Sequence, residues 1–236
     1  MTTTFLHAEW RKLLMFNYAV DANLLTPYLP AKTELDYWND TCYVSLVGFM
    51  FLNTRLRNIP VPFHRNFEEV NLRFYVRYKD KHEWKRGVVF IKEIVPRPAL
   101  SIVARRFYKE NYATMPMHHK WVDEDNKLIV EYAWKYGQWN SISAVADNTL
   151  QPINTGSEEE FITEHYWGYT KINTFNTTEY RVEHPGWKVY NINAYNISVD
   201  FEKVYGNQFG YLSAIKPKSV FLAEGSVIKV NSKTML

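Results

Sequence analysis

The stretch Phe67-Glu68-Glu69-Val70-Asn71-Leu72-Arg73-Phe74-Tyr75-Val76-Arg77-Tyr78 carries the clearest pattern in the chain. From residue 69 onward apolar and polar residues alternate, which is the period of a β-strand. One face of the predicted strand therefore carries Val70, Leu72, Phe74, Val76 and Tyr78. The other face carries Glu69, Asn71, Arg73, Tyr75 and Arg77. Periodicity alone favours contact of this second face with solvent, but inside a cavity its carboxylate and guanidinium groups would suit an acid or a polarised carbonyl.

Further strands are predicted on both sides of this stretch. Residues 43–52 form an apolar run that is typical of a strand buried on both faces. Residues 87–95 form the next strand, and 81–86 form the polar turn before it. Strands joined by a turn at Gly137 are expected over 127–136 and 138–145, and others over 180–183, 187–197 and 219–230. Gly225 interrupts the last of these and is expected to form a bulge.

Only short helices are predicted. Asp21 is expected to cap a helix over 22–29 that the next proline ends. Pro98 fits the first position of a second helix, because the missing N–H of proline would have no partner there. Ser157 and Glu160 form a capping box for a third helix that runs to about residue 165. Many strands with three or four short helices predict an α+β fold in which antiparallel sheet dominates.

Composition places the chain among folded proteins. It has 236 residues, of which 46% are hydrophobic and 17% aromatic, with a net charge of +3. Such values are expected for a single folded domain spanning residues 1–236, and they exclude a disordered chain. The small charge excess argues against nucleic acid as a partner. The longest apolar run, 44–52, is far shorter than the roughly 20 residues of a membrane-spanning helix.

The expected cellular location follows from two further observations. Cys42 is the only cysteine, so no intramolecular disulfide can form, which fits a reducing compartment. Charged residues at positions 9, 11 and 12 interrupt the region in which a signal peptide needs an apolar stretch. We therefore expect a cytoplasmic protein without membrane attachment.

The sequence contains no common catalytic or metal-binding motif. His118 and His119 are adjacent, so on a strand they would face opposite sides and could not hold one metal ion. Cys42 precedes an apolar run and is expected to be a small buried residue rather than a nucleophile. The signatures of P-loop, dinucleotide-binding and Gly-Xaa-Ser-Xaa-Gly proteins are missing. We expect neither a metal nor a cofactor.

A second polar segment offers candidate binding residues. The run 104–112, Ala-Arg-Arg-Phe-Tyr-Lys-Glu-Asn-Tyr, closes the second predicted helix. Its cations lie where the helix dipole favours them, which is a sufficient explanation for their presence. In a pocket, however, Arg105 or Lys109 would clamp an anion, or a buried lysine would act as a nucleophile.

Several segments together resemble a bacterial protein family. They are 67–76, 87–90, 104–108, 111–113, Met115, Phe161-Ile162-Thr163-Glu164-His165-Tyr166 and Val182-Glu183-His184-Pro185-Gly186-Trp187, with support from Leu29-Pro30, Leu35-Asp36 and 43–49. Each motif is short, and the combination extends over nearly the whole chain. The set resembles the YqjF-like family of uncharacterised conserved proteins, in the acetoacetate decarboxylase-like superfamily.

The resemblance implies a fold and also a changed site. The implied fold is an antiparallel sheet curled into a barrel or cone around an internal pocket, with short helices outside. Acetoacetate decarboxylases form a Schiff base through a lysine in a segment Gly-Arg-Glu-Xaa-Trp-Gly-Phe-Pro-Lys-Lys. Against that segment Arg105 matches the arginine and Tyr108 approximates the tryptophan, while Arg106 replaces the glutamate. Tyr112 and Ala113 replace the two lysines, so the Schiff-base amine is expected to be lost.

Three kinds of function remain open from the sequence. In the first, the chain binds a small acidic or carbonyl-bearing molecule in a pocket near Glu69, Arg73, Arg105, Tyr108 and Tyr112. In the second, it is an enzyme (a lyase, isomerase or hydrolase) that acts on a keto or enol acid, with Glu69 as acid or base and Tyr112 as proton donor. In the third, exposed Trp and Tyr side chains serve a protein partner or a homodimer.

Overall fold

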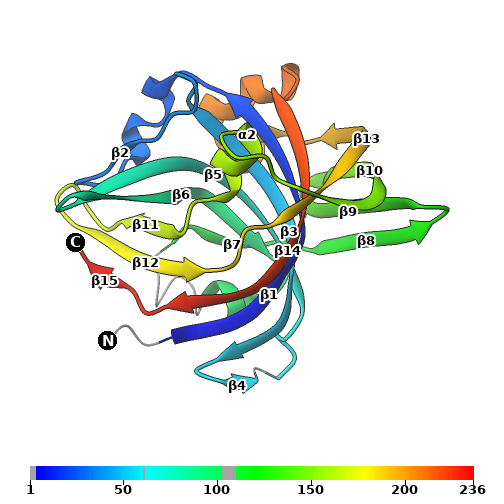
Figure 1. Ribbon diagram of the computed structural model, residues 1–236, viewed down its shortest axis with the longest axis horizontal. Coiled ribbons are helices and arrows are strands. Elements are labelled where there is room, and N and C mark those ends of the chain that lie inside the picture. Colours follow the sequence, from blue (N-terminus) through cyan, green and yellow to red (C-terminus); the bar gives the residue numbers. More distant parts are fainter. Residues whose placement is uncertain (1–3, 61, 103–109) are drawn as a thin grey trace.

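The strand predicted over residues 69–78 lies at the centre of a large sheet. In the computed structural model, which describes residues 4–60, 62–102 and 110–236, this strand is β5, Phe67–Asp80. It pairs antiparallel with β3, Tyr43–Leu56, on one side and with β6, Glu83–Val95, on the other (Figure 1). One of its two faces joins a hydrophobic core, as the alternation predicts, through Val70, Leu72, Phe74 and Val76.

Seven strands close into a curved ring. Beyond β3 lie β1, Thr4–Ala19, and then β14, Ser219–Asn231. Beyond β6 lie β11, Trp167–Lys171, and β12, Thr177–Glu183. β12 also pairs with β14, where Val182 lies opposite Val230, and this pairing joins the two ends of the row. The expected barrel or cone is therefore a curved, mostly antiparallel sheet that returns on itself.

The sheet continues beyond the ring as a second layer. From β14 it passes to β13 (Lys188–Ser198), β10 (Gln138–Pro152), β9 (Lys127–Tyr136) and β8 (Met117–Glu124). Val130 of β9 and Ile142 of β10 share a core with Leu46 and Leu72. This layer therefore covers the outer face of the ring. Short strands complete the sheet, namely β2 (Glu34–Leu35), β4 (Ile59–Pro60), β7 (Tyr112–Thr114) and β15 (Thr234–Met235).

A short helix closes part of the ring's interior. This helix is α2, Glu158–Thr163, and the side chain of Ser157 accepts a hydrogen bond from the Glu160 N–H, as the capping box predicts. Phe161 of α2 lies inside the ring against Tyr43 and Tyr75. The helix therefore covers one part of the inner core.

Two more helices, which were not predicted from the sequence, contribute to the outer core, the hydrophobic core between the ring and the second layer. They are α3, Phe201–Tyr205, and the 3-10 helix η3, Asn207–Ala214. Another helical segment begins at Pro98, as expected, and is described through residue 102.

The strands of the ring are buried on both faces because a core lies on each side of the sheet. The predicted apolar strand illustrates this, since β3 is buried at every position from Tyr43 to Phe51. β1 is buried in the same way from Leu13 to Tyr18. Such a strand has no apolar–polar alternation. β3 was predicted from its long apolar run, whereas the apolar part of β1 is shorter and follows charged residues, so no strand was predicted there.

Three local predictions were wrong. The helix expected over 22–29 is two 3-10 turns, η1 (Ala22–Leu24) and η2 (Thr26–Tyr28), because the proline at position 27 cannot donate within a continuous helix. The turn before β6 is much shorter than 81–86, since residues 83–86 pair with β5. Gly225 forms no bulge and pairs in register with Arg11, whereas the bulge lies in β1 near Lys12, on the side of β3.

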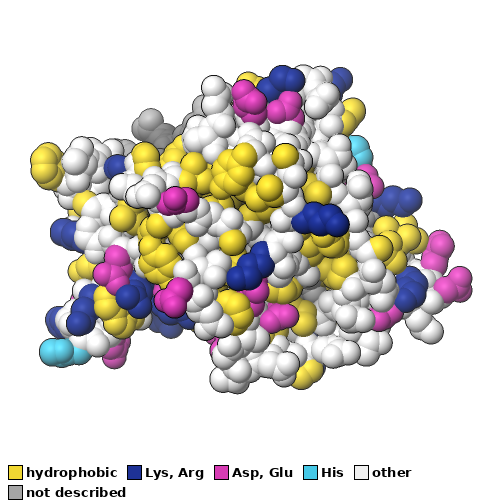
Figure 2. All heavy atoms as spheres, turned by 90° about the horizontal axis from the view of Figure 1, so that it is seen from above, with side chains coloured by type: hydrophobic (Ala, Val, Ile, Leu, Met, Phe, Trp, Pro, Cys, Tyr) yellow, Lys and Arg dark blue, Asp and Glu magenta, His cyan; other side chains and the backbone are white. Residues whose placement is uncertain are grey.

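The surface carries mixed charges. Seen from above, Lys and Arg side chains are interspersed with Asp and Glu side chains around a central group of apolar ones (Figure 2). In the part of the chain that the structure describes, no helix is long and apolar enough to cross a bilayer, and the longest, η3, has eight residues.

Replacement of Gly225 by alanine is expected to destabilise the ring. Gly225 has φ +79°, and a Cβ atom there would lie 2.0 Å from the carbonyl oxygen of Trp10. We expect Gly225→Ala to lower the free energy of unfolding by about 2–4 kcal/mol in urea titrations. Gly137→Ala is the matched control, because Gly137 has φ +71° with no atom within 4 Å, so only about 1 kcal/mol should be lost. Equal losses for the two variants would contradict this account.

Candidate functional site

A cavity of about 100 Å³ lies inside the ring of strands. Each of the seven ring strands contributes at least one side chain to its wall, so the cavity exists only because the ring is closed. The apolar part of the wall includes Trp10, Phe49, Phe51, Phe90 and Val182. At about 10–15 Å³ for one water, the space suits an organic molecule of only a few heavy atoms.

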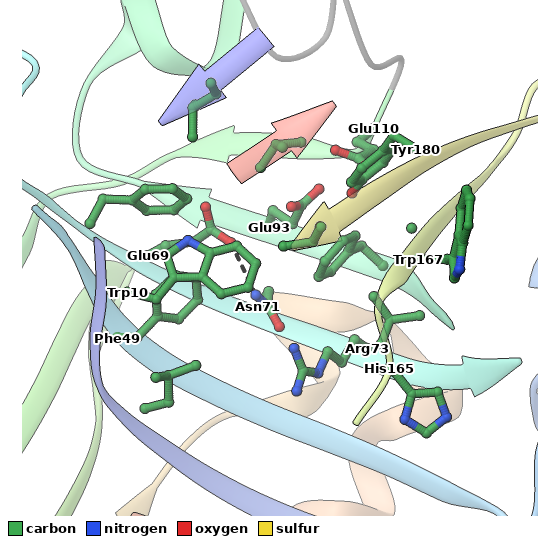
Figure 3. Close-up of a pocket in the computed structure, with 18 of the residues that line it drawn as sticks. Trp10, Phe49, Glu69, Asn71, Arg73, Glu93, Glu110, His165, Trp167 and Tyr180 are labelled. Carbon is green, nitrogen blue, oxygen red and sulfur yellow. Dashed lines mark hydrogen bonds between the residues drawn. The ribbon is translucent and has the colours of Figure 1, made fainter. Parts of the chain in front are cut away.

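The polar face of β5 points into this cavity. Glu69, Asn71 and Arg73 all line it, and Glu69 is only 3% exposed. The alternation predicted which residues share this face, and the closed ring turned that face away from solvent. Figure 3 shows Glu69 beside Trp10 and Phe49, with Asn71 between Glu69 and Arg73.

Strand register brings further polar residues to the same place. Asn71, Glu93 and Tyr112 are partners in one row across β5, β6 and β7. Within β6 a bulge occurs at Ile91, because Leu72 pairs with Lys92 whereas Arg73 pairs with Phe90. The extra residue places Phe90 and Glu93 together on the wall of the cavity, although strict alternation would put them on opposite faces.

A side chain outside β6 supports this bulge. The amide nitrogen of Asn111 donates to the carbonyl oxygen of Ile91 at 2.9 Å. The backbone N–H of Glu93 in turn donates to the carbonyl oxygen of Asn111 at 3.0 Å. Asn111 therefore forms hydrogen bonds with two backbone groups of β6 at the bulge, and it positions Tyr112, the next residue, in β7.

Three buried carboxyl groups meet at one end of the cavity. Glu69 accepts from the Asn71 amide at 3.0 Å and from the Tyr112 hydroxyl at 3.4 Å. Glu110 accepts from the Tyr180 hydroxyl at 2.7 Å. Glu93 is close enough to Glu110 for the two carboxyl groups to share a hydrogen bond. Figure 3 shows Glu69, Glu93, Glu110 and Tyr180 in the upper part of the view, above Arg73 and His165.

Burial raises the pKa of all three carboxyl groups. Loss of hydration, together with repulsion from Glu110, raises the pKa of Glu69 to about 8. Burial raises the pKa of Glu110 to about 7, and it raises the pKa of Glu93 well above 4.5 with added repulsion from its two neighbours. This end of the cavity therefore offers acidic protons as well as oxygen atoms.

The other end of the cavity is cationic. Arg73 is 7% exposed, and its Nη2 atom donates to the sulfur of Met15, a weak acceptor 3.9 Å away. No carboxylate of a described residue forms an ion pair with it, and its Nε atom has no partner. His165 lies next to Arg73 in Figure 3 and lines the same cavity.

Several buried polar atoms around the cavity have no hydrogen-bond partner among the described residues. They are Trp10 Nε1, Asn71 Oδ1, Arg73 Nε, Glu93 Oε2 and His165 Nδ1. Buried polar groups in folded proteins are nearly always paired, because an unpaired one costs about 1–3 kcal/mol. A concentration of such atoms around one cavity is typical of a site that binds a polar molecule.

Three of the five residues singled out from the sequence lie together in this cavity. Glu69, Arg73 and Tyr112 line it, whereas Arg105 and Tyr108 lie outside the described residues. The sequence analysis did not select Glu93, Glu110 or His165. An acidic residue within the apolar predicted strand 87–95 was a signal for Glu93. No local pattern pointed to Glu110 or His165 as pocket residues.

Other candidates lie elsewhere. No lysine is among the described residues that line the cavity. Lys92, whose pKa burial lowers, donates to the carbonyl oxygen of Val204 in the outer core region. Cys42 is buried, which raises the pKa of its thiol to about 11. His118 and His119 contact different carboxylates, and no three described His, Cys, Asp or Glu side chains form a metal-binding group.

Comparison with known proteins identifies relatives of the chain. The model of the DUF2071 family, described as "Uncharacterized conserved protein", matches residues 7–227. Uncharacterized protein YqjF of Bacillus subtilis (strain 168) is 29% identical over 197 residues, which are 81% of this chain and 77% of that protein.

Solved structures share the fold. The enduracididine biosynthesis enzyme MppR with HEPES buffer bound matches with a TM-score of 0.73 and 12% identity, over 100% of this chain and 89% of that one. Acetoacetate decarboxylase from Legionella pneumophila matches with a TM-score of 0.65 and 14% identity, over 98% of this chain and 87% of that one. The implied acetoacetate decarboxylase-like fold is thus confirmed, and at these identities the likeness concerns the fold alone.

The buried carboxyl groups make stability depend on pH. An unfolded chain releases the Glu69 proton near pH 4.5, whereas the folded chain holds it to about pH 8, so folding is expected to weaken as the pH rises between these values. Glu69→Gln removes the contribution of Glu69 to this dependence. The unfolding free energy of wild type should fall between pH 5 and pH 8.5. In urea titrations we expect that of the variant to fall by about 1–3 kcal/mol less over the same range.

A second variant separates this effect from a general loss of charge. Glu131→Gln removes a carboxylate from the half-exposed part of β9, and its unfolding free energy should follow the wild-type pH dependence. If Glu69→Gln followed the same curve, the buried carboxyl group would not be protonated as described.

Proposed function

The chain belongs to the DUF2071 family of uncharacterized conserved proteins, and we propose that it binds a small carboxylic acid that carries a carbonyl group, inside the ring of strands. The observation that carries this proposal is Arg73. A buried guanidinium group without a carboxylate is costly, because its lost hydration is not replaced. A carboxylate ligand would supply the missing acceptor through two parallel hydrogen bonds.

The opposite end of the cavity holds groups that can give or take a proton. Glu69, whose pKa is raised to about 8, and the hydroxyl of Tyr112, which donates to Glu69 at 3.4 Å, lie together there. Groups of this kind stabilise the carbonyl-bearing part of a ligand when a carbon or oxygen atom gains negative charge. A second carboxylate at this end would instead be repelled by any ionised member of the glutamate cluster, which favours a monocarboxylic acid.

The middle of the cavity supports a short apolar chain. Trp10, Phe49 and Phe51 lie together and pack edge to face or tilted, with ring centroids 5.4–5.9 Å apart. The small volume limits the ligand to a few carbon atoms. Small oxo acids such as pyruvate, 2-oxobutanoate and acetoacetate match these requirements.

Binding is proposed to be noncovalent. The resemblance of residues 104–113 to the Schiff-base segment of acetoacetate decarboxylases implies that Tyr112 replaces the lysine, and Tyr112 lines the cavity. A phenol cannot form the iminium group that accepts electrons in decarboxylation. The proposal therefore retains the acid-binding pocket and excludes the Schiff-base step at this position.

Arg73→Gln should weaken binding of these acids by about 10- to 100-fold, because a hydrogen bond to a charged group contributes about 1.5–3 kcal/mol. Isothermal titration of pyruvate, 2-oxobutanoate and acetoacetate measures this change. Arg77→Gln is the control, since Arg77 follows on the same strand, half-exposed and paired with Glu34. Binding of none of the acids, or a lysine adduct trapped by borohydride, would contradict the proposal.

A second candidate function is proton transfer on the bound acid. The contact between Tyr112 and Glu69, with a Glu69 pKa of about 8, favours it. A general acid or base works best when its pKa lies near the working pH. Of the enzyme classes considered from the sequence, an isomerase that interconverts keto and enol forms relies on such proton-transfer groups.

This candidate predicts enzyme-dependent exchange of protons next to the carbonyl. In D₂O we expect the protein to speed deuterium incorporation into a bound oxo acid. The loss of the proton NMR signal next to the carbonyl measures this rate. Glu69→Gln should reduce the rate by about 10²- to 10⁴-fold, while Tyr112→Phe should reduce it less. Glu131→Gln should leave the rate unchanged. Exchange at the buffer rate with wild-type protein would limit the function to binding.

A further inference from the structure

His165 forms a buried pair with Asp36 at the cationic end of the cavity. Its Nε2 atom lies 3.1 Å from Asp36 Oδ2, and the His165 side chain is 1% exposed. Arg86 also donates to Asp36 Oδ2, at 2.7 Å. The imidazole ring is fixed between Tyr75 and Phe161, with ring centroids 4.7 and 5.0 Å away. Neither partner of this pair was given a contact with the ligand in the proposed function.

This arrangement decides which nitrogen of His165 carries a proton. Burial alone would raise the pKa of Asp36, but hydrogen bonds from His165 and Arg86 outweigh it, so the carboxylate is ionised. It can only accept, and therefore Nε2 carries the proton. Burial also lowers the pKa of His165 to about 4, so the ring is neutral at pH 7 and Nδ1 has a free lone pair.

The lone pair of Nδ1 has no partner among the described residues. The atom is buried, and His165 lines the same cavity as Arg73. Most orphan atoms of the site can be satisfied by water or by a ligand of several kinds. An acceptor in the same cavity as the guanidinium group is more selective, because a ligand whose carboxylate binds Arg73 must present a donor on the adjacent carbon.

We propose that His165, held by Asp36, is the second proton-transfer group of this pocket, and that its Nδ1 atom accepts from the C2 hydroxyl group of the enol form of a bound 2-oxo acid. The inference rests on the proposed function and selects a substrate class within it. With the C1 carboxylate at Arg73, the C2 oxygen lies at His165 and C3 extends along β5 toward Glu69. A 3-oxo acid would place its carbonyl one carbon too far from His165.

The resulting reaction is a keto–enol interconversion. From the enol, Nδ1 of His165 takes the proton of the C2 hydroxyl group, and the electrons of that O–H bond form the C2=O bond. The electron pair of the C2=C3 bond takes a proton from the carboxyl group of Glu69, which becomes a carboxylate. Transfer of the proton from imidazolium to Glu69 through solvent restores both groups. No oxidant, reductant or metal ion is consumed.

Two variants separate the roles of the two ring nitrogens. His165→Gln keeps a group that can donate to Asp36 but removes the acceptor at Nδ1. His165→Asn keeps an acceptor near the position of Nδ1 but cannot take a proton. His118→Gln is the control, because His118 lies on β8 beside Glu131, outside the cavity wall. Each variant is compared with wild type for binding by titration and for exchange in D₂O.

The expected outcome is a loss of exchange without a matching loss of binding. Exchange at C3 of 2-oxobutanoate should fall at least 100-fold in both His165 variants, while Kd changes less than 10-fold in His165→Asn. Acetoacetate should show no protein-dependent exchange. Failure of wild type to bind any oxo acid would refute the proposed function, whereas normal binding with unchanged exchange in His165→Gln would refute only the role of His165.

The pH profile and the ring tautomer give tests that need no variant. His165 is surrounded by Asp36, Arg86 and Arg73, and Glu69 by Glu93, Glu110, Tyr112 and Arg73. Exchange should be fastest between the pKa values of about 4 and about 8 and should fall on both sides. Nitrogen-15 NMR at pH 7 should show a neutral ring protonated on Nε2; protonation on Nδ1 would overturn the inference.

Discussion

The pairing of β12 with β14 is the constraint on which the site depends. Without it the sheet would be open, and the polar face of β5 would meet water. With it, Glu69 and Arg73 lie inside a closed ring and lose most of their hydration. Loss of hydration changes the chemistry of the two groups in opposite ways, because the carboxyl group can bind a proton and become neutral whereas the guanidinium group stays charged.

The buried polar groups of the site lower the stability of the folded chain. Three carboxyl groups, an arginine without a carboxylate partner and several orphan polar atoms share one small cavity. The two large cores on either side of the ring, with strands buried on both faces, supply the stability that this arrangement requires. Proteins commonly accept such local instability where a site must bind or react. A ligand that satisfied these atoms would stabilise the fold on binding.

The backbone of a fold that other proteins share sets the polar row in this cavity. Solved structures of this fold include an acetoacetate decarboxylase and a biosynthetic enzyme. In this chain the row of Asn71, Glu93 and Tyr112 brings amide, carboxyl and phenol groups together on the cavity wall. The bulge at Ile91, held by Asn111, is the backbone device that aligns this row.

Local pattern in the sequence determined the strand at 69–78, the two sets of residues on its faces, the capping box at Ser157 and the absence of a lysine at position 112. It could not show which face of that strand is inside, because closure of the ring depends on residues more than 100 positions away. It missed β1, since a strand buried on both faces has no alternation. Only the tertiary structure brought Glu93, Glu110 and His165 to the cavity, through a bulge, strand register and the end of α2, none of which leaves a periodic signal.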